Sequence, residues 1–313
     1  MTRITIIVLA VLISIPATAE VLTVPSDSFP TIAAAIAASA PGDEIAIEPG
    51  VYQEGDIECH HGITIRSSLA GEPVTIDAQG FEVGLFLYTR DADTTISDLV
   101  IMNAGAGLLI NGDSPTFETL VSNCQFIENT SSGVGGQWGN AHFESCRMGS
   151  NGGSGWNWQY GSISMIDCLL DNNGFSGAYT VGVSLDWENV VIENNVGEDG
   201  GGMMLIASAG NFRNLRIENN TALDAGGGVC LSSDGTYFFD ECTIADCSAN
   251  RGSQGFFEGV FGYTIDATFN CSEVDTTQFA GEDWDAGRIL ITNEGCSVPV
   301  QSRSWSSIKS DFR

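Results

Sequence analysis

The sequence predicts an all-β solenoid of parallel strands with a short capping helix at its N-terminal end. Three observations lead to this fold class: a repeat of 22–27 residues, three apolar columns that persist through seven repeats, and an asparagine at a fixed place in most repeats. A repeat of this length, with short strand-like segments and no helical periodicity, is typical of one turn of a β-solenoid.

Residues 1–19 are expected to be a signal peptide. Arg3 precedes an apolar run from Ile4 to Ile15, and Ala17-Thr18-Ala19 supplies the small-x-small pattern that precedes cleavage. The run is too short to cross a bilayer, and no other stretch approaches the necessary length. We therefore expect a secreted, extracellular or cell-surface protein with no transmembrane segment in the mature chain.

Residues 20–95 are expected to form an N-terminal cap and the first coils. The segment from Ile32 to Ala40 is alanine-rich, with Ile32 and Ile36 on one helical face, and Pro41 ends it. A helix laid across the open apolar end of a solenoid would cover it. Gly50 to Glu54 is similar to the Gly-x-Tyr-x-Glu start of pectin methylesterases, but the later aspartate motifs of that family are missing. We assign this segment to the cap.

Residues 96–255 contain the regular coils, in which equivalent residues would stack at the strand spacing of roughly 4.8 Å. The reference column consists of Leu99, Cys124, Cys146, Cys168, Val190, Leu215 and Cys242. Three residues earlier stand Ile96, Val121, Phe143, Met165, Trp187, Phe212 and Phe239, and two residues later stand Ile101, Phe126, Met148, Leu170, Ile192, Ile217 and Ile244. All three columns are apolar, which indicates that they face the interior.

A fourth column stands five residues after the reference position and contains Asn129, Asn151, Asn173, Asn195 and Asn220. An asparagine amide both donates and accepts hydrogen bonds, so each copy can bond to the copies above and below it. The sequence therefore predicts an inward-facing asparagine ladder at one turn of the coil.

The periodicity stops after Gly255. We expect residues 256–300 to cover the C-terminal end and residues 301–313 to be a tail. Cys271 and Cys296 lie outside the repeats and are the best disulfide candidates among the nine cysteines of an exported chain. Cys124, Cys146 and Cys168 share an interior column, which favours a reduced thiol ladder over a metal site.

Several segments resemble a known family. Phe29-Pro30-Thr31-Ile32, Pro41-Gly42-Asp43-Glu44-Ile45 and Pro49-Gly50-Val51-Tyr52 resemble the opening of pectin-lyase-like β-helix proteins, and Glu218-Asn219-Asn220-Thr221-Ala222 with Gly226-Gly227-Gly228-Val229 is similar to bacterial exported and surface members. The resemblance covers roughly residues 21–255. It implies a right-handed parallel β-helix and, because this scaffold supports many activities, no particular reaction.

The chain is strongly acidic, with 40 acidic and 11 basic residues and a formal net charge of −29. Such a surface repels nucleic acid. Divalent cations and uncharged or cationic polymers remain reasonable partners.

A column of carboxylates is the candidate metal site. Asp171, Glu193 and Glu218 occupy equivalent outward positions, with Arg216 beside two of them and Arg147 farther along the same face. Stacked like charges repel by roughly 1 kcal/mol per pair even in water, and a calcium ion or an arginine would relieve this. The column is a candidate calcium or uronate-binding face, and an ordinary solvated edge is the alternative.

Aromatic residues crowd adjacent coils, which suggests a platform for stacking on sugars: Trp138, Trp156, Trp158, Tyr160 and Tyr179. Trp156 and Trp158 align with interior columns and are expected in the core, whereas Tyr179 aligns with Asn157 on the outside. Tyr179, together with Arg216 and Arg147 of the carboxylate face, is a candidate ligand-binding residue.

No catalytic residues can be assigned, because the signature strings of polygalacturonases and pectate lyases are absent. We expect a secreted or surface β-helix module that binds carbohydrate or another extracellular polymer. Two alternatives stay open: a polysaccharide lyase or glycoside hydrolase of this fold whose residues come from different coils, and a structural or adhesive surface protein.

Overall fold

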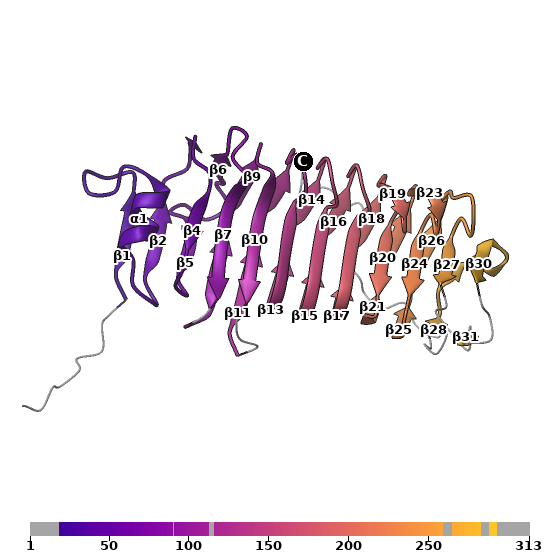
Figure 1. The fold of residues 1–313 in the computed structure, drawn as a ribbon. Coiled ribbons are helices and arrows are strands. Elements are labelled where there is room, and N and C mark those ends of the chain that lie inside the picture. Colours follow the sequence, from indigo (N-terminus) through magenta and orange to yellow (C-terminus); the bar gives the residue numbers. More distant parts are fainter. Residues whose placement is uncertain (1–18, 90, 113–115, 259–264, 283–287, 293–313) are drawn as a thin grey trace, which may run out of the picture.

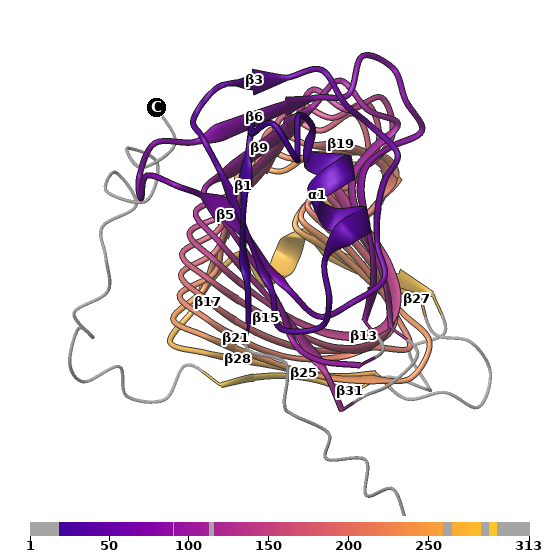
Figure 2. The same ribbon diagram turned by 90° about the vertical axis from the view of Figure 1, so that its left-hand side faces the viewer.

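The computed structural model describes residues 19–89, 91–112, 116–258, 265–282 and 288–292, which wind into one elongated coil (Figure 1). Seen along its axis, the coil has walls of stacked parallel strands around a common interior (Figure 2). The fold class expected from the sequence is confirmed: a right-handed parallel β-helix with very little helix.

In the part of the chain that the structure describes, sheet A has nineteen strands. It forms two walls that share β13 (Val134–Glu144), β15 (Trp156–Ile166) and β17 (Ala178–Glu188). The other strands of the first wall are β4 (Ile57–Cys59), β7 (Val83–Thr89), β10 (Ala106–Gly112), β20 (Met203–Ile206), β24 (Val229–Ser232), β27 (Gly255–Glu258) and β30 (Phe279–Glu282). Those of the second wall are β1 (Val21–Val24), β2 (Glu44–Ile47), β5 (Thr64–Ser67), β8 (Thr94–Ser97), β11 (Glu118–Ser122), β21 (Ala209–Arg213), β25 (Gly235–Asp240), β28 (Ile265–Asn270) and β31 (Arg288–Thr292).

Sheet B forms the third wall, with ten short strands among the described residues. They are β3 (Val51–Tyr52), β6 (Val74–Asp77), β9 (Leu99–Met102), β12 (Gln125–Ile127), β14 (Arg147–Gly149), β16 (Leu169–Asp171), β18 (Val191–Glu193), β22 (Arg216–Glu218), β26 (Thr243–Ala245) and β29 (Glu273–Val274). A two-stranded sheet C pairs β19 (Val196–Asp199) with β23 (Thr221–Ala225).

Left-handed turns explain the paired asparagines. The first member of each pair, Asn172, Asn194 or Asn219, has a φ between 55° and 59° and ends a strand of sheet B. Asparagine adopts this backbone region more readily than most residues. The next residue then points inward, which is why an Asn-Asn pair marks the same corner in consecutive coils.

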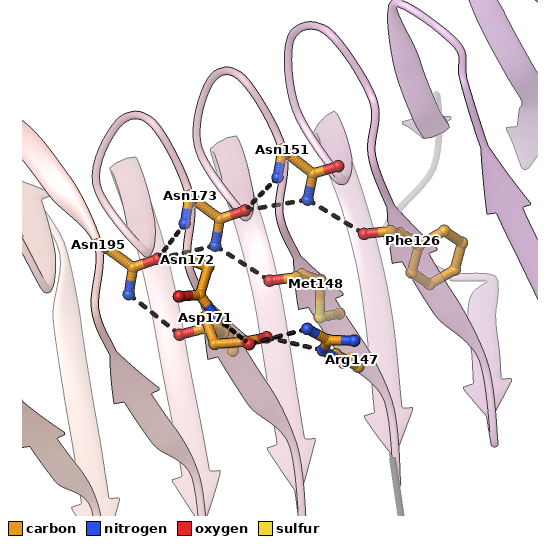
Figure 3. A network of polar contacts seen from close by, with 9 residues as sticks. Phe126, Arg147, Met148, Asn151, Asp171, Asn172, Asn173 and Asn195 are labelled. Atoms are coloured by element: carbon orange, nitrogen blue, oxygen red, sulfur yellow. Dashed lines mark hydrogen bonds and ion pairs between the residues drawn. The ribbon is translucent and has the colours of Figure 1, made fainter. Parts of the chain in front are cut away.

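The inward asparagines form the predicted ladder. In each step the backbone N–H and the Nδ2 of one asparagine donate to Oδ1 of the next: Asn151 donates to Asn173 at 3.1 and 3.0 Å (Figure 3). The same Nδ2 also donates to the carbonyl of Phe126 at 3.0 Å. Because the five side chains are buried, these bonds replace those that water would otherwise supply.

The apolar columns are confirmed by the strand register. Val121, Phe143, Met165, Trp187, Phe212 and Phe239 are successive partners and are all buried. Rings within this column stack directly, with centroids 4.8 Å apart between Phe212 and Phe239. The interior is therefore continuous from coil to coil.

The predicted capping helix is α1 (Ile32–Ala38), which lies at the N-terminal end of the coil with Ile32 and Ile36 buried (Figure 2). It ends two residues earlier than expected: Ser39 already has an extended backbone, and Pro41 disfavours the helical region for Ala40. Glu54 accepts hydrogen bonds from the backbone N–H groups of Ile32 and Ala33 at 2.9 and 3.0 Å. The Gly50–Glu54 segment thus has the structural role assigned to it.

The C-terminal end differs from the expectation of a separate cap over residues 256–300. Strands β27, β28 and β29 pair in register with β24, β25 and β26, so the described part of this segment continues the coil. Phe269 extends the aromatic column and stacks on Phe239 at 4.6 Å. The apolar alternation therefore persists although the repeat length changes. A 3-10 turn, η1 (Thr276–Gln278), precedes β30.

The expected signal peptide, apart from its last residue, and the tail over 301–313 lie outside the described residues. None of the helices in the described part of the chain has the length and apolarity needed to cross a bilayer.

Candidate functional site

The three carboxylates of the candidate metal site lie in register. Asp171 on β16 is the partner of Glu193 on β18, which is the partner of Glu218 on β22. Asp171 differs from the outward position expected for it, since only 5% of the residue is exposed. It is covered because Arg147, one coil away, donates to both of its oxygens (Figure 3).

The arginines neutralise this column from within. Arg147 is ion-paired with Asp171 and Arg216 with Glu218. Both oxygens of Asp171 are already hydrogen-bonded, whereas calcium needs six to eight oxygen ligands. Among the described residues there is no group of three or more histidine, cysteine or acidic side chains placed to hold a metal ion. As it stands, the donor set does not suit calcium, and calcium binding here stays a prediction.

The crowded aromatic residues divide into two sets. Trp156 and Trp158 are fully buried and stack on each other with centroids 5.0 Å apart, as expected from their columns. Tyr179 lies beside Asn157 on the outer face and packs against a small buried cluster that includes Met204 and Cys230. Tyr179 is therefore half-buried rather than a free platform.

Trp138 and Tyr160 form the exposed set. Their rings stack with centroids 4.2 Å apart, and the residues are 56% and 39% exposed. Both have left-handed backbones, with φ of 61° and 59°, at the corner where β13 and β15 pass from the first wall to the second. A Cβ at Gly182 would come within 2.7 Å of the Tyr160 ring, so the glycine leaves room for this stack. The backbone thus fixes two aromatic rings on the outside of adjacent coils.

An open groove lies on the outer face of the first wall, immediately before this corner. Its volume is about 230 Å³. Its lining consists of Phe86, Leu109, Ile110, Asn111, Ser132, Gly135, Gly136, Gln137, Asn157 and Gln159. Four of these residues carry amides and none carries a charge. In chain order, Trp138 follows Gln137 and Tyr160 follows Gln159.

The register brings the amides together. Asn111, Gln137 and Gln159 are successive partners on β10, β13 and β15, while Gly135 stands between Leu109 and Asn157 in the neighbouring outward column. A Cβ at Gly135 would approach the Leu109 side chain to 2.7 Å. The missing side chain at Gly135 therefore deepens the groove between the amides and Leu109.

A second depression lies on the second wall, with a volume of about 350 Å³. It is lined by Asp186, Asn211, Phe212, Arg213, Phe238 and Asp240. Arg213, the cationic residue of its lining, forms ion pairs with neighbouring carboxylates, at 3.4 Å from Glu188 and 3.9 Å from Asp186. Phe238 is its exposed ring. This depression differs from the groove in being charged.

The thiol column is buried as expected. Cys124, Cys146 and Cys168 are fully buried and unpaired by disulfides. Burial, together with hydrogen bonds to its two neighbours in the column, raises the pKa of Cys146 well above its ordinary value. The predicted Cys271–Cys296 disulfide stays a prediction, because Cys296 lies outside the described residues.

Sequence reasoning missed the groove. It named Trp138 and Tyr160 only as part of a crowd and did not name Asn111, Gln137 or Gln159. The available signal was in the outward columns, where Gly135 interrupts larger residues and amides recur at the same position in three coils. The counting that aligned Tyr179 with Asn157 also aligns these residues, but only the structure shows the space left at Gly135.

The coil and its register define a parallel β-helix protein. Residues 83–244, more than half of the chain, match the family described as right handed beta helix region, and the chain belongs to this family. A comparison with curated protein sequences finds no match.

Two solved structures are similar to this chain, and the first of them illustrates the likeness in fold. The crystal structure of pectate lyase Pel9A is similar with a TM-score of 0.52 and 14% identity, covering 83% of this chain and 80% of that chain. An alginate lyase from Paenibacillus sp. str. FPU-7 is similar with a TM-score of 0.48 and 12% identity, covering 87% of this chain and 98% of that chain. At these identities the likeness concerns the fold alone.

Proposed function

We propose that this protein is a secreted carbohydrate-binding β-helix, and that the groove of the first wall with the adjoining Trp138–Tyr160 stack holds the sugar chain. The observation that carries the proposal is this stack, two exposed aromatic rings placed in register beside an amide-lined groove. Exposed, rigidly held aromatic residues next to convergent polar groups are typical of ligand sites.

The backbone of the stack supports a functional origin. A left-handed conformation is unfavourable for a bulky residue, and such strain persists where the surroundings impose it, often at functional sites. Most other turns of this coil place a smaller residue in this conformation, chiefly asparagine, aspartate or serine, and asparagine and aspartate tolerate it at less cost. Trp138 and Tyr160 remain 56% and 39% exposed in this conformation and so gain less from burial than the core aromatic residues; contact with a ligand gives the exposed ring surface a role.

The groove supplies binding groups rather than reacting groups. Its amides and Ser132 can donate to and accept from sugar hydroxyls. None of its lining residues carries a carboxylate, thiol or imidazole, so the described groove offers no acid–base pair for bond cleavage. The likeness in fold to a pectate lyase adds support for a carbohydrate ligand. Binding is therefore the proposed activity.

Export is part of the proposal. The charged start, the apolar run and the Ala-x-Ala pattern at residues 3–19 support it. Expression of the full chain in a bacterial host, followed by N-terminal sequencing of the extracytoplasmic fraction, should yield a chain that begins at Glu20. A full-length chain retained in the cytoplasm would contradict export.

Affinity electrophoresis and calorimetry against a panel of polysaccharides test the binding site, with release of reducing or unsaturated products recorded in parallel. Trp138→Asn removes the ring and keeps a residue that tolerates the left-handed backbone. We expect this variant to bind roughly tenfold more weakly, which corresponds to the loss of about 1.4 kcal/mol.

Phe238→Thr is the matched control, because it removes an exposed ring from the second depression. Unchanged binding in Trp138→Asn, or a loss confined to Phe238→Thr, would contradict the assignment of the groove. Product release by the unaltered protein would show that the protein is an enzyme rather than a binding module.

A further inference from the structure

We infer that the groove binds an extended, uncharged polysaccharide that runs along the coil axis across five coils. His60 and Tyr88 form a second aromatic contact, at the end of the groove nearest the N-terminus of the protein. The inference rests on the proposed function and adds to it the length, direction and charge class of the ligand.

The second contact is a stack between His60, which follows β4, and Tyr88 on β7, at the end of the groove nearest the N-terminus. The rings of His60 and Tyr88 are parallel to within 11°, with centroids 4.6 Å apart. Phe86, which lines the groove, lies 4.3 Å from Tyr88 between ring centroids. The His60 ring is held by Glu58 through a 3.0 Å contact and remains about half exposed. Aromatic surface therefore continues beyond the groove on this side.

The strand register places the His60–Tyr88 stack and the amides of the groove in line along the coil axis. Tyr88 is the partner of Asn111, which precedes Gln137 and Gln159 in the same outward column. Cys59 is the partner of Leu87, so His60 follows beside Tyr88. From His60 to Gln159 the column crosses five strands and four strand spacings, which amounts to roughly 19 Å. A ligand that contacts both ends must be extended and parallel to the coil axis.

The charges argue against a polyanion, and the amides of the lining favour a ligand rich in hydroxyl groups. A polyuronate is held by bidentate arginines or by bound cations, and the groove lining contains neither lysine nor arginine. Each of the five arginines whose side chains are described, Arg66, Arg147, Arg213, Arg216 and Arg251, is ion-paired with a carboxylate. With a net charge of −29, the protein repels polyanions. Amides instead match hydroxyl groups.

Calorimetry with two sets of polymers tests the inference: neutral xylan, glucomannan, mixed-linkage glucan and dextran, and acidic polygalacturonate and alginate, all in EDTA. We expect at least one neutral polymer to bind, with an affinity that hardly changes between low and high salt. Its oligosaccharides should bind more tightly as they lengthen, until they span the column. Both acidic polymers should bind at least about tenfold more weakly.

The variants separate the inference from the proposed function. Tyr88→Thr and His60→Ser should abolish the gain in affinity of long over short oligosaccharides and leave short ones unaffected, whereas Trp138→Asn should weaken both. Phe238→Thr is again the control.

Binding that depends on Trp138 but is unaltered in Tyr88→Thr and His60→Ser would overturn the five-coil span and keep the proposed function. Preferred binding of an acidic polymer that depends on Trp138 would overturn the charge class alone. Failure of every polymer to bind would overturn both.

Discussion

Arg147 and Asp171 form a bidentate ion pair between adjacent coils, with Nε–Oδ1 and Nη2–Oδ2 both at 2.8 Å. Gly149, the partner of Asp171 in the register, makes room for it: a Cβ there would lie 2.3 Å from Oδ1 and 2.8 Å from Nε. The hydrogen bond to Asp171 in turn raises the pKa of Arg147. A column that looks like repelling carboxylates in the sequence is thus partly neutralised by its own neighbours.

This pair should contribute measurably to stability. Arg147→Gln leaves the buried Asp171 carboxylate without its cation, and we expect a loss of roughly 1.5–3 kcal/mol in the free energy of unfolding. Gly149→Ala should reduce stability as well, because its methyl group displaces both partners. Denaturant unfolding measures both effects. A double variant, Arg147→Gln with Asp171→Asn, that is no more stable than Arg147→Gln alone would show that the pair is not the cause.

Calcium binding at Asp171, Glu193 and Glu218 has to compete with the arginines. We therefore expect weak binding in the unaltered protein and tighter binding in Arg147→Gln, where Asp171 loses its cation and keeps only the hydrogen bond from Asn172. The melting temperature of that variant should rise on calcium addition. Calorimetric titration checks this. No heat in either protein, or heat that persists in Asp171→Asn with Glu193→Gln, would remove the calcium site.

The asparagine ladder should depend on each of its members. The amide of Asn173 bonds to Met148 and Asn195 and accepts from Asn151. Asn173→Ala leaves these buried groups unpaired and should reduce stability by roughly 1–3 kcal/mol. Asn211→Ala is the control, because Asn211 is exposed on the second wall. Equal melting temperatures for both variants would count against the ladder.

The buried thiols should be inert in the folded protein. Burial raises the pKa of Cys242 to about 12, and partial burial raises that of Cys247 to about 11. Cys124, Cys146 and Cys168 are fully buried. Iodoacetamide at pH 8 should modify these residues only after unfolding. Peptide mapping of the same samples tests the Cys271–Cys296 disulfide. Labelling of Cys146 in the native protein, or of Cys271 without reduction, would contradict the respective prediction.

Asp43 should make the N-terminal end sensitive to acid. Hydrogen bonds from the backbone N–H of Ala40 and of Glu20, both at 2.8 Å, lower the pKa of Asp43 below 3.8. A lowered pKa contributes stability that is present above the unfolded-state value and is lost as the pH falls through the folded-state value. Asp43→Asn should therefore be less stable than the unaltered protein at pH 7, and the difference should vanish toward pH 2.

Cleavage after Ala19 would turn the backbone nitrogen of Glu20 into an α-ammonium group beside Asp43, which strengthens this contact at neutral pH. Thermal unfolding of the cleaved chain and of its Asp43→Asn variant across pH 2–7 measures how the stability difference depends on pH. If the stability difference between the unaltered protein and Asp43→Asn were constant from pH 2 to pH 7, the acid sensitivity would not come from the Asp43 carboxylate.

The sequence by itself determined the coil. In a solenoid each turn contacts only its neighbours, so every interior column repeats at one interval and can be counted along the chain. The Phe143 column, the Asn173 ladder and the burial of Trp156 and Trp158 followed from that counting alone. The continuation of the coil through Phe269 did not, because the repeat length changes there while the alternation survives.

Only the tertiary structure decided the outer face. The alternation that sends residues in or out fails at a left-handed corner, so the exposure of Trp138 and Tyr160 could not be counted from the sequence. The groove combines side chains from several coils with the space left at Gly135. The pairing of Arg147 with Asp171 depends on how a long side chain crosses between coils. Outward side chains lack the packing that fixes the core columns, and their partners are set by the register and the local space together.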